Sequence, residues 1–244
     1  MKLMSSKNYE LIPLEWDTAY FGLSSAKVNL RGVVEMRGQE EIIEFCKNYD
    51  FVTIANNDNL KENNYWIGNM TNSFLTDVNI QLIKFLVDKP KNVLENTYVV
   101  NNLARNERIL EIARGTFNHS RFFNDPKLPH QKAKNIYVHW TESAFSKDNK
   151  YFAIAEKEGN IIGYILFSIH EDTSVIELIA VDERYQGQRV GRTLVNRMES
   201  YVIDVGTRKI KVGTQVNNIS AIQFYFAMRF KYMSTTSIYH LHRK

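Results

Sequence analysis

The hydrophobic and polar positions of residues 176–202 predict a buried strand, a polar loop and an amphipathic helix, in that order. The segment IELIAV at residues 176–181 is apolar except for one glutamate, which indicates a strand buried in a sheet. Apolar side chains then recur at helical spacing, so a helix should begin near Val190. The glycine-containing loop after the strand therefore ends at a helix N-terminus.

Apolar runs elsewhere predict the rest of the architecture. Residues 151–155 and 161–169 are rich in β-branched and aromatic side chains on either side of a turn, and they predict strands buried in a sheet flanked by helices. In the first part of the chain, residues 51–55 and 78–87 predict strands, and residues 39–47 predict a helix. The fold class is therefore α/β, with an α+β arrangement of elements.

A polar break, KPK at residues 89–91, divides the chain into two predicted units. Residues 1–94 form a smaller N-terminal α/β domain, and residues 95–244 form the second unit. From Thr97 onward we expect a strand, two helices, three strands, the helix that begins near Val190, a strand, another helix and a final pair of strands. The second unit is expected to carry the chemistry.

The loop before Val190 has the composition of an anion site. The first turn of a helix has free N–H groups and a positive dipole end. Gly187 and Gly191 allow another group to approach closely, while Arg184, Arg189 and Arg192 add positive charge. These features favour a phosphate-rich ligand. On these residues alone, a tight turn with solvated arginines is an equal alternative.

This loop resembles the acetyl-CoA loop of the GNAT N-acetyltransferase superfamily, Q/R-x-x-G-x-G/A. The matching residues are Gln186, Gly187, Gln188, Arg189, Val190 and Gly191. Arg189 stands where the superfamily usually has its middle glycine.

A later segment resembles a second motif of the superfamily, N-x-x-A-x-x-hydrophobic-Y, on the helix beside the cofactor. The matching residues are Asn218, Ala221, Phe224, Tyr225 and Phe230. Arg229 replaces the glycine that often precedes this phenylalanine. A glycine there commonly ends the helix in the left-handed conformation, so we expect this helix to end differently.

The resemblance implies a mixed, mostly antiparallel sheet flanked by helices, with acetyl-CoA as cosubstrate and no metal. It implies the following cofactor-binding residues: Leu178, Ile179, Val181, Gln186, Gly187, Gln188, Arg189, Val190, Gly191, Arg192, Asn218 and Ala221.

Three separated segments are similar to the bacterial dTDP-fucosamine acetyltransferases. They are LEWDTAYFG at residues 14–22, FNHSRF at residues 117–122 with Trp140 further on, and TQVNNISAIQFY at residues 214–225. This family acetylates the 4-amino group of a dTDP-linked 4-amino-4,6-dideoxy sugar. The resemblance therefore implies a dTDP-amino sugar acceptor used in surface polysaccharide synthesis.

Two residues are candidates for proton transfer. The resemblance places Tyr225 beside the thioester sulfur, where its phenol can protonate the leaving thiolate; the alternative is a packed aromatic on an apolar helix face. Glu177 is the candidate base, because burial in the strand would raise the pKa of its carboxyl. Water as the proton carrier and an exposed structural position for Glu177 both stay open. An amide N–H of residues 178–181 is expected to polarise the thioester carbonyl.

Charge and aromatic surface for a sugar nucleotide come together around Arg121. Phe122 and Phe123 follow it, and Ser120 and Asn118 offer hydrogen bonds. The alternative is a helix-end arginine over a core aromatic pair.

Trp16 and Tyr20, with Phe21, are expected to line the same cleft. An N-terminal aromatic cluster is also typical of a hydrophobic core, and this alternative stays open.

Composition narrows the function classes. The chain has 244 residues with 31 Lys and Arg against 27 Asp and Glu, a net charge of +4 that is too small to indicate nucleic acid binding. No signal peptide or membrane-spanning run is visible, so we expect a cytoplasmic protein without a membrane partner.

Neither cysteine nor histidine indicates a metal site. The single cysteine, Cys46, excludes an internal disulfide and fits a buried core thiol. His240 and His242 share one face of a terminal strand, but two ligands without a nearby carboxylate make a poor site, so we expect surface histidines.

Two other functions stay open. The acceptor is a different amine, such as a peptide, a polyamine or an antibiotic, or the chain is a non-catalytic acyl-CoA-binding module, since Arg189 and Arg229 both replace motif glycines. The sequence leaves the oligomeric state open, with a homodimer among the allowed states.

Overall fold

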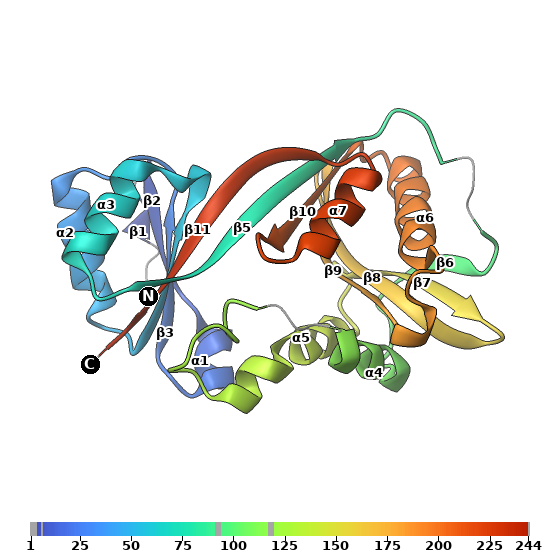
Figure 1. The fold of residues 1–244 in the computed structure, drawn as a ribbon, viewed down its shortest axis with the longest axis horizontal. Helices are drawn as coiled ribbons and strands as arrows, with labels where there is room; N and C mark the ends of the chain where they lie inside the picture. Colours follow the sequence, from blue (N-terminus) through green and yellow to red (C-terminus); the bar gives the residue numbers. More distant parts are fainter. Residues whose placement is uncertain (1–3, 6, 91–93, 117–119, 244) are drawn as a thin grey trace.

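The computed structural model describes residues 4–5, 7–90, 94–116 and 120–243, and these form one mixed sheet flanked by helices (Figure 1). The sheet has 11 strands in the order β1-β2-β3-β4-β11-β5-β10-β9-β8-β7-β6. Its neighbouring strands are antiparallel except for the pairs β3–β4 and β9–β10, which are parallel. The predicted mixed, mostly antiparallel sheet with flanking helices is therefore confirmed.

The strands along the chain are β1 (Met4–Ser5), β2 (Tyr9–Pro13), β3 (Ser25–Leu30), β4 (Phe51–Asn56), β5 (Phe74–Phe85), β6 (Thr97–Asn101), β7 (Tyr151–Lys157), β8 (Asn160–His170), β9 (Thr173–Val181), β10 (Lys209–Gln215) and β11 (Lys231–His242). The helices are α1 (Glu15–Phe21), α2 (Met36–Cys46), α3 (Lys61–Met70), α4 (Glu107–Thr116), α5 (His130–Ala144), α6 (Val190–Asp204) and α7 (Ile219–Ala227), with short 3-10 turns η1 (Asn57–Asn59) and η2 (Glu183–Tyr185).

Two long strands, β5 and β11, run through both halves of the molecule (Figure 1). Strand β11 pairs with β5 over residues 231–240 and with β4 over residues 237–242, and β5 also pairs with β10. The expected final pair of strands is wrong, because β11 is one continuous strand of 12 residues. A division of the chain near residue 94 stays a prediction, since β11 follows this point in sequence yet pairs with strands that precede it.

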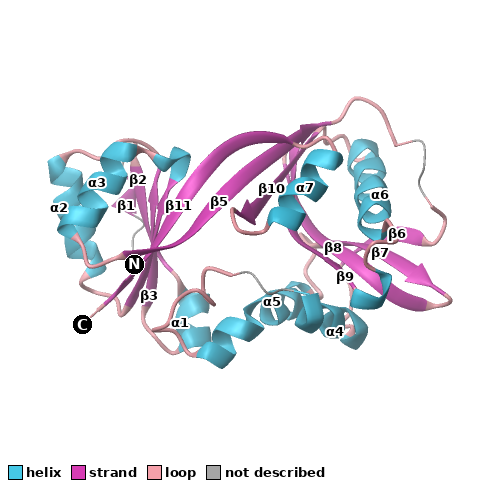
Figure 2. Cartoon of the chain, in the orientation of Figure 1, coloured by secondary structure: helices cyan, strands magenta, loops and turns pink. Residues whose placement is uncertain are grey.

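Helices cover both faces of the sheet (Figure 2). Apolar residues of α2 and α3 pack on one face of the first half, and those of α6 and α7 pack on the same face of the second half. Helices α1, α4 and α5 pack against the opposite face. Cys46 packs in the core between α2, α3 and the sheet. Burial there raises the pKa of its thiol to about 12, so the predicted buried thiol is confirmed.

The helix that carries Tyr225 ends in the left-handed conformation even though it lacks the glycine. Arg229 has φ of 65°. The N–H of Phe230 donates to the carbonyl of Tyr225 at 3.0 Å, and that of Arg229 donates to Phe226 at 2.9 Å. These two bonds form a Schellman motif, so the expectation that α7 ends differently is wrong. Contact between the rings of Tyr225 and Phe230, 5.3 Å apart, holds this end in place.

Among the described residues, no helix is both long and apolar enough to span a bilayer.

Candidate active site

The central strands β9 and β10 separate part-way along their length. They pair over residues 173–176 and 209–212, and beyond this point β9 continues beside β8 while β10 continues beside β5. Backbone groups of residues 178–181 that point toward β10 therefore have no partner in the sheet ladder within the described chain. A cavity of about 840 Å³ lies at this separation.

Most of the predicted cofactor residues line this cavity. The residues that do are Leu178, Ile179, Val181, Gln186, Gly187, Gly191, Asn218 and Ala221, together with the proton-transfer candidates Glu177 and Tyr225. The structure places Gln188, Arg189, Val190 and Arg192 in the same loop and helix start but outside the cavity lining.

The N-terminus of α6 is presented beside the cavity without a side-chain cap. Gly187 and Arg189 adopt left-handed conformations, with φ of 75° and 64°. Arg189 therefore has the backbone geometry that a glycine favours, and its side chain is exposed. The free N–H groups of the first helical turn and the positive dipole end favour an anion here.

Asp182 holds the start of this loop. Its carboxylate accepts a hydrogen bond from the backbone N–H of Arg184 at 2.9 Å, two more from the Arg184 guanidinium, and another from Arg108 on α4. These bonds, led by those of the Arg184 side chain, hold the pKa of Asp182 well below its usual range. Arg184 is thus engaged within the loop, while Arg189 and Arg192 remain exposed.

Gly191 and Asn218 set the contact between α6 and α7. A Cβ on Gly191 would lie 3.2 Å from the ring of Phe224, so a larger residue would push the two helices apart. The side chain of Asn218 accepts a hydrogen bond from the N–H of Ala221 at 3.2 Å and caps α7. Close approach of these helices places the next residue, Tyr225, at the cavity.

Tyr225 lines the cavity with a side chain that is 3% exposed. Its ring packs against Phe224 and Phe230. Burial raises the pKa of its phenol well above the ordinary value, so the hydroxyl stays protonated at neutral pH. The position fits a proton donor, and the role itself stays a prediction.

Glu177 is not buried. It is the extra residue of a β-bulge, because the register of β8 and β9 passes from Leu166–Leu178 to Phe167–Ile176. Its side chain is exposed and forms an ion pair with Lys150 at 2.5 Å. The premise that Glu177 is buried in the strand is therefore wrong, and its role as base stays a prediction without that support.

Arg121 lies in the described segment that begins at Ser120, whereas Phe117 and Asn118 fall outside the described residues. The guanidinium lies over the ring of Phe122, 4.0 Å from its centroid. Its Nε atom is buried without a hydrogen-bond partner. Burial lowers the pKa of Arg121, while nearby Tyr137 and two aspartates oppose that shift.

Two neighbours of Arg121 in sequence, Ser120 and Phe122, are buried, and a third, Phe123, is exposed. Phe122 is 1% exposed and packs in the core below the guanidinium, so it supports Arg121 from the apolar side. The hydroxyl of Ser120 accepts a bond from the N–H of Phe122 at 3.1 Å. Substrate contact by Ser120 and Phe122 stays a prediction, and a buried ring offers little surface for it.

Trp16 and Tyr20 stack on each other with ring centroids 5.2 Å apart, and Tyr20 stacks on His139 of α5 at 4.7 Å. The hydroxyl of Tyr20 donates to the carbonyl of Lys132 at 2.7 Å. Phe21 is buried in the core. Neither Trp16 nor Tyr20 lines the cavity, so the stack joins α1 to α5, and contact with an acceptor stays a prediction.

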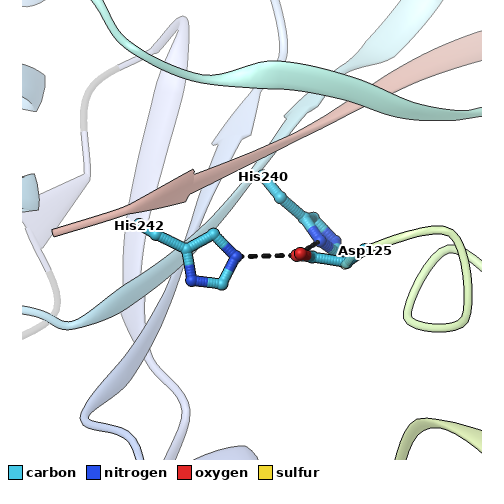
Figure 3. Close-up of side chains that lie close together, drawn as sticks. All are labelled: Asp125, His240 and His242. Atoms are coloured by element: carbon cyan, nitrogen blue, oxygen red, sulfur yellow. Dashed lines mark hydrogen bonds and ion pairs between the residues drawn. The ribbon is translucent and has the colours of Figure 1, made fainter. Parts of the chain in front are cut away.

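The expected surface histidines are wrong. His240 is fully buried and its Nδ1 lies 2.6 Å from Oδ2 of Asp125, while Nε2 of His242 lies 2.7 Å from the same oxygen (Figure 3). The carboxylate comes from the segment before α5, which sequence spacing did not connect with β11. The cluster ties the C-terminal strand to that segment.

The three side chains are close enough together to bind a cation, but their hydrogen bonding favours a proton-linked cluster. Nε2 of His240 is buried without a partner. Metal binding at Nδ1 would place the ring proton on Nε2 and bury an unpaired donor. A proton on Nδ1 that is donated to Asp125 leaves only a lone pair at Nε2.

Burial of His240 predicts that stability falls in mild acid. Burial lowers the pKa of His240 to about 4, against about 6.5 in an unfolded chain. Between these values the unfolded chain binds a proton that the folded protein does not, so the free energy of unfolding falls as pH falls from 6.5 to 4, by on the order of 3 kcal/mol. Urea unfolding of wild type and His240→Gln measures this.

The difference between the two proteins isolates the cluster of His240, Asp125 and His242, because titrating groups outside this cluster are common to both. The stability advantage of wild type should be largest at pH 7.5 and should shrink toward pH 4.5. An advantage that is equal at both pH values would contradict the assignment of a neutral, buried His240.

Comparison with known proteins gives a family and several relatives. A model of the acetyltransferase (GNAT) family matches residues 107–230. The spore coat polysaccharide biosynthesis protein SpsD of Bacillus subtilis is 30% identical over 135 residues, which are 55% of this chain and 47% of SpsD. The dTDP-fucosamine acetyltransferase of Escherichia coli O6:H1 is 23% identical over 221 residues, 87% of this chain and 89% of that protein.

The match thus spans less than half of the length of SpsD. Among solved structures, the GCN5-related N-acetyltransferase from Kribbella flavida superposes with a TM-score of 0.68 at 7% identity, covering 100% of this chain and 90% of that chain. At this identity the likeness concerns the fold.

Proposed function

The chain belongs to the acetyltransferase (GNAT) family, and we propose that it transfers the acetyl group of acetyl-CoA to the amino group of a nucleotide-linked amino sugar. The reaction class, N-acetyl transfer, is that of the family. The acceptor we propose is a dTDP-4-amino-4,6-dideoxyhexose used in surface polysaccharide synthesis. The observation that carries this acceptor is Arg121, a half-buried cation whose Nε is buried without a partner, near the cavity wall residue Tyr137.

The cavity has the parts that acetyl-CoA binding requires. We assign the diphosphate to the N-terminus of α6, where free N–H groups and the exposed Arg189 and Arg192 favour negative charge. We assign the extended pantetheine arm to the separation of β9 and β10, whose unpaired backbone groups can bond its amides. The thioester then lies near Tyr225.

In the transfer the amine nitrogen attacks the thioester carbonyl carbon, the C–S bond breaks, and the products are an N-acetyl sugar and free CoA. The amine must lose one proton and the leaving thiolate gains one. Tyr225 supplies the second proton from its hydroxyl, and solvent restores it. A backbone N–H among residues 178–181 stabilises the oxyanion.

Two further points support the nucleotide sugar. The relative that aligns with most of the chain is named a dTDP-fucosamine acetyltransferase, and SpsD is named a polysaccharide biosynthesis protein. Arg121 is also well suited to phosphate, because its planar guanidinium offers paired donors to two oxygens.

Incubation of the protein with acetyl-CoA and dTDP-4-amino-4,6-dideoxygalactose tests the proposal. We expect free thiol release together with a nucleotide sugar that has gained one acetyl group on nitrogen, detected by mass spectrometry. Thiol release with peptide or polyamine amines, and none with any dTDP-amino sugar, would reject the proposed acceptor and leave the family assignment intact.

A further inference from the structure

A row of polar side chains leads away from the cavity along one face of the sheet. On β5, Asp77, Asn79 and Gln81 alternate with other residues and so share this face. Asn79 pairs across the ladder with Gln215, which lines the cavity. Gln215 donates to the hydroxyl of Tyr137 on α5 at 3.2 Å, so this is the face that α5 covers. Asp77 therefore lies two residues along the strand from the cavity edge.

Arg121 lies near Asp77, and its charge also acts on a more distant pair of charged residues. The pKa of Asp77, that of Asp17 on α1 and that of Lys27 on β3 all respond to the Arg121 charge. Strands β4 and β11 separate β3 from β5, which places Lys27 about 14 Å farther from the cavity than Asp77. Lys27 thus lies farther from the cavity than Asp77, and the Arg121 charge acts on both.

These charges lie partly or fully away from solvent. Asp77 is 8% exposed, and Arg121 and Lys27 are half-buried. Nε of Arg121 is itself buried and has no hydrogen-bond partner. A folded core does not gain from such an arrangement, because buried charges stabilise only when they are paired.

The titration of these groups agrees with a site prepared for a ligand. Burial raises the pKa of Asp77 to about 6, although the Arg121 charge opposes the shift. Burial likewise lowers the pKa of Lys27. Tyr137 also faces Asp77, and His240 with its partner Asp125 lies farther along the same face of β11. A carboxylate with this pKa is ionised at pH 7 and is still basic enough to accept a proton from an activated amine.

We propose that Asp77 is the catalytic base: it takes a proton from the protonated amine of the acceptor, which leaves a neutral nitrogen that can attack the thioester. The proposal rests on the proposed function for the orientation of the acceptor, whose phosphates lie at Arg121 and beyond, so that its amino sugar reaches Asp77 and the cavity. Asp77 passes the first proton to solvent. The nitrogen then forms its bond to the carbonyl carbon as the C–S bond breaks, Asp77 takes the second proton from this nitrogen, and solvent removes it while Tyr225 protonates the thiolate. Glu177 is the less favourable candidate for this role, because its carboxylate is paired with Lys150.

The alternative is that Asp77 only balances the charge of Arg121. Asp17 offers a matched control, since it is a second partly buried carboxylate whose pKa the Arg121 charge lowers, but it lies on α1 away from the thioester. A charge-balancing role predicts the same behaviour for Asp77→Asn and Asp17→Asn. A base predicts different pH profiles.

We expect Asp77→Asn to lower kcat at pH 7 by about 100-fold or more, within the range of general base catalysis. The wild-type acidic limb near pH 6 should be absent from this variant and present in Asp17→Asn. The rate of Asp77→Asn should recover about tenfold per pH unit up to the pKa of the amine, because solution then supplies neutral amine. Asp77→Glu should retain the limb and part of the rate.

The stability of Asp77→Asn distinguishes a base from a purely structural residue, because the two roles predict changes of opposite sign. An aspartate whose pKa is higher in the folded protein than in the unfolded chain destabilises the fold above that pKa. Asp77→Asn should therefore have an unfolding midpoint in urea at pH 8 that is equal to or above that of wild type. A lower midpoint, or a variant that keeps the wild-type rate and acidic limb, overturns the proposal.

Each assay uses whichever amine the wild-type protein acetylates, so the two ideas fail separately. Acetylation of a simple amine alone would reject the nucleotide sugar, and the Asp77 comparison would still be decided with that amine. Acetylation of the nucleotide sugar with an Asp77→Asn rate equal to wild type would reject only the base.

Discussion

Replacing Tyr225 with phenylalanine is expected to lower the rate of acetyl transfer by about 100-fold or more, while the Kd for acetyl-CoA changes by less than about twofold. Protonation of the thiolate of CoA as it leaves favours breakdown of the tetrahedral intermediate to products, and general acids contribute in this range. Burial keeps the pKa of the Tyr225 phenol high, so the proton is present throughout the neutral range. Single-turnover kinetics measure this step without a contribution from product release.

The phenylalanine variant should remain folded, because the ring contacts with Phe224 and Phe230 do not involve the hydroxyl. Tyr151→Phe is a matched control: this tyrosine stacks on Phe167 outside the cavity, and its loss of a hydroxyl should leave the rate unchanged. An unchanged single-turnover rate for Tyr225→Phe would remove Tyr225 from the mechanism and leave it as a packed aromatic.

Arg121→Gln is expected to raise the KM for the nucleotide sugar by about 10- to 100-fold, the effect of losing a charged hydrogen bond worth about 1.5–3 kcal/mol. The KM for acetyl-CoA should change little, because the cofactor residues lie on other elements. Arg121→Lys should recover only part of the affinity, since an ammonium lacks the paired donors of a guanidinium.

Initial-rate measurements with each substrate varied separately check this result. Arg31→Gln serves as the control, because Arg31 is an exposed arginine that directly follows β3 and pairs with Glu10. If Arg121→Gln raised the KM values of both substrates equally, Arg121 would be a structural residue. An unchanged KM for the sugar would likewise place the acceptor elsewhere.

The sequence predicts the part of the site that depends on local pattern. Strand β9, the glycine loop and α6 are consecutive, and their apolar spacing together with the glycines and arginines of the loop predicts an anion site. Arg189 and Arg229 limit this kind of inference. Both adopt left-handed conformations that the sequence assigns to glycine, because helix ends with several backbone bonds can compensate for the cost of a Cβ there.

The acceptor side depends on contacts between distant segments, and single-sequence patterns miss it. Asp77 and Gln215 are brought together by the pairing of β5 with β10, and Asp125 meets His240 across 115 residues. One signal was present: the alternation of Asp77, Asn79 and Gln81 with less polar residues marks a strand with one polar face. For Glu177 the sequence pattern predicted burial that does not occur, because a bulge turns this residue of an apolar run toward solvent.

The most direct test of the account is the comparison of kcat/KM for dTDP-4-amino-4,6-dideoxygalactose, its 4-epimer, the same amino sugar without the nucleotide, and a peptide amine. The account predicts that one dTDP-linked epimer exceeds the nucleotide-free sugar and the peptide by about 100-fold or more, because Arg121 contributes only when phosphates are present. Equal values for the amines with and without the nucleotide would contradict a nucleotide-sugar acceptor.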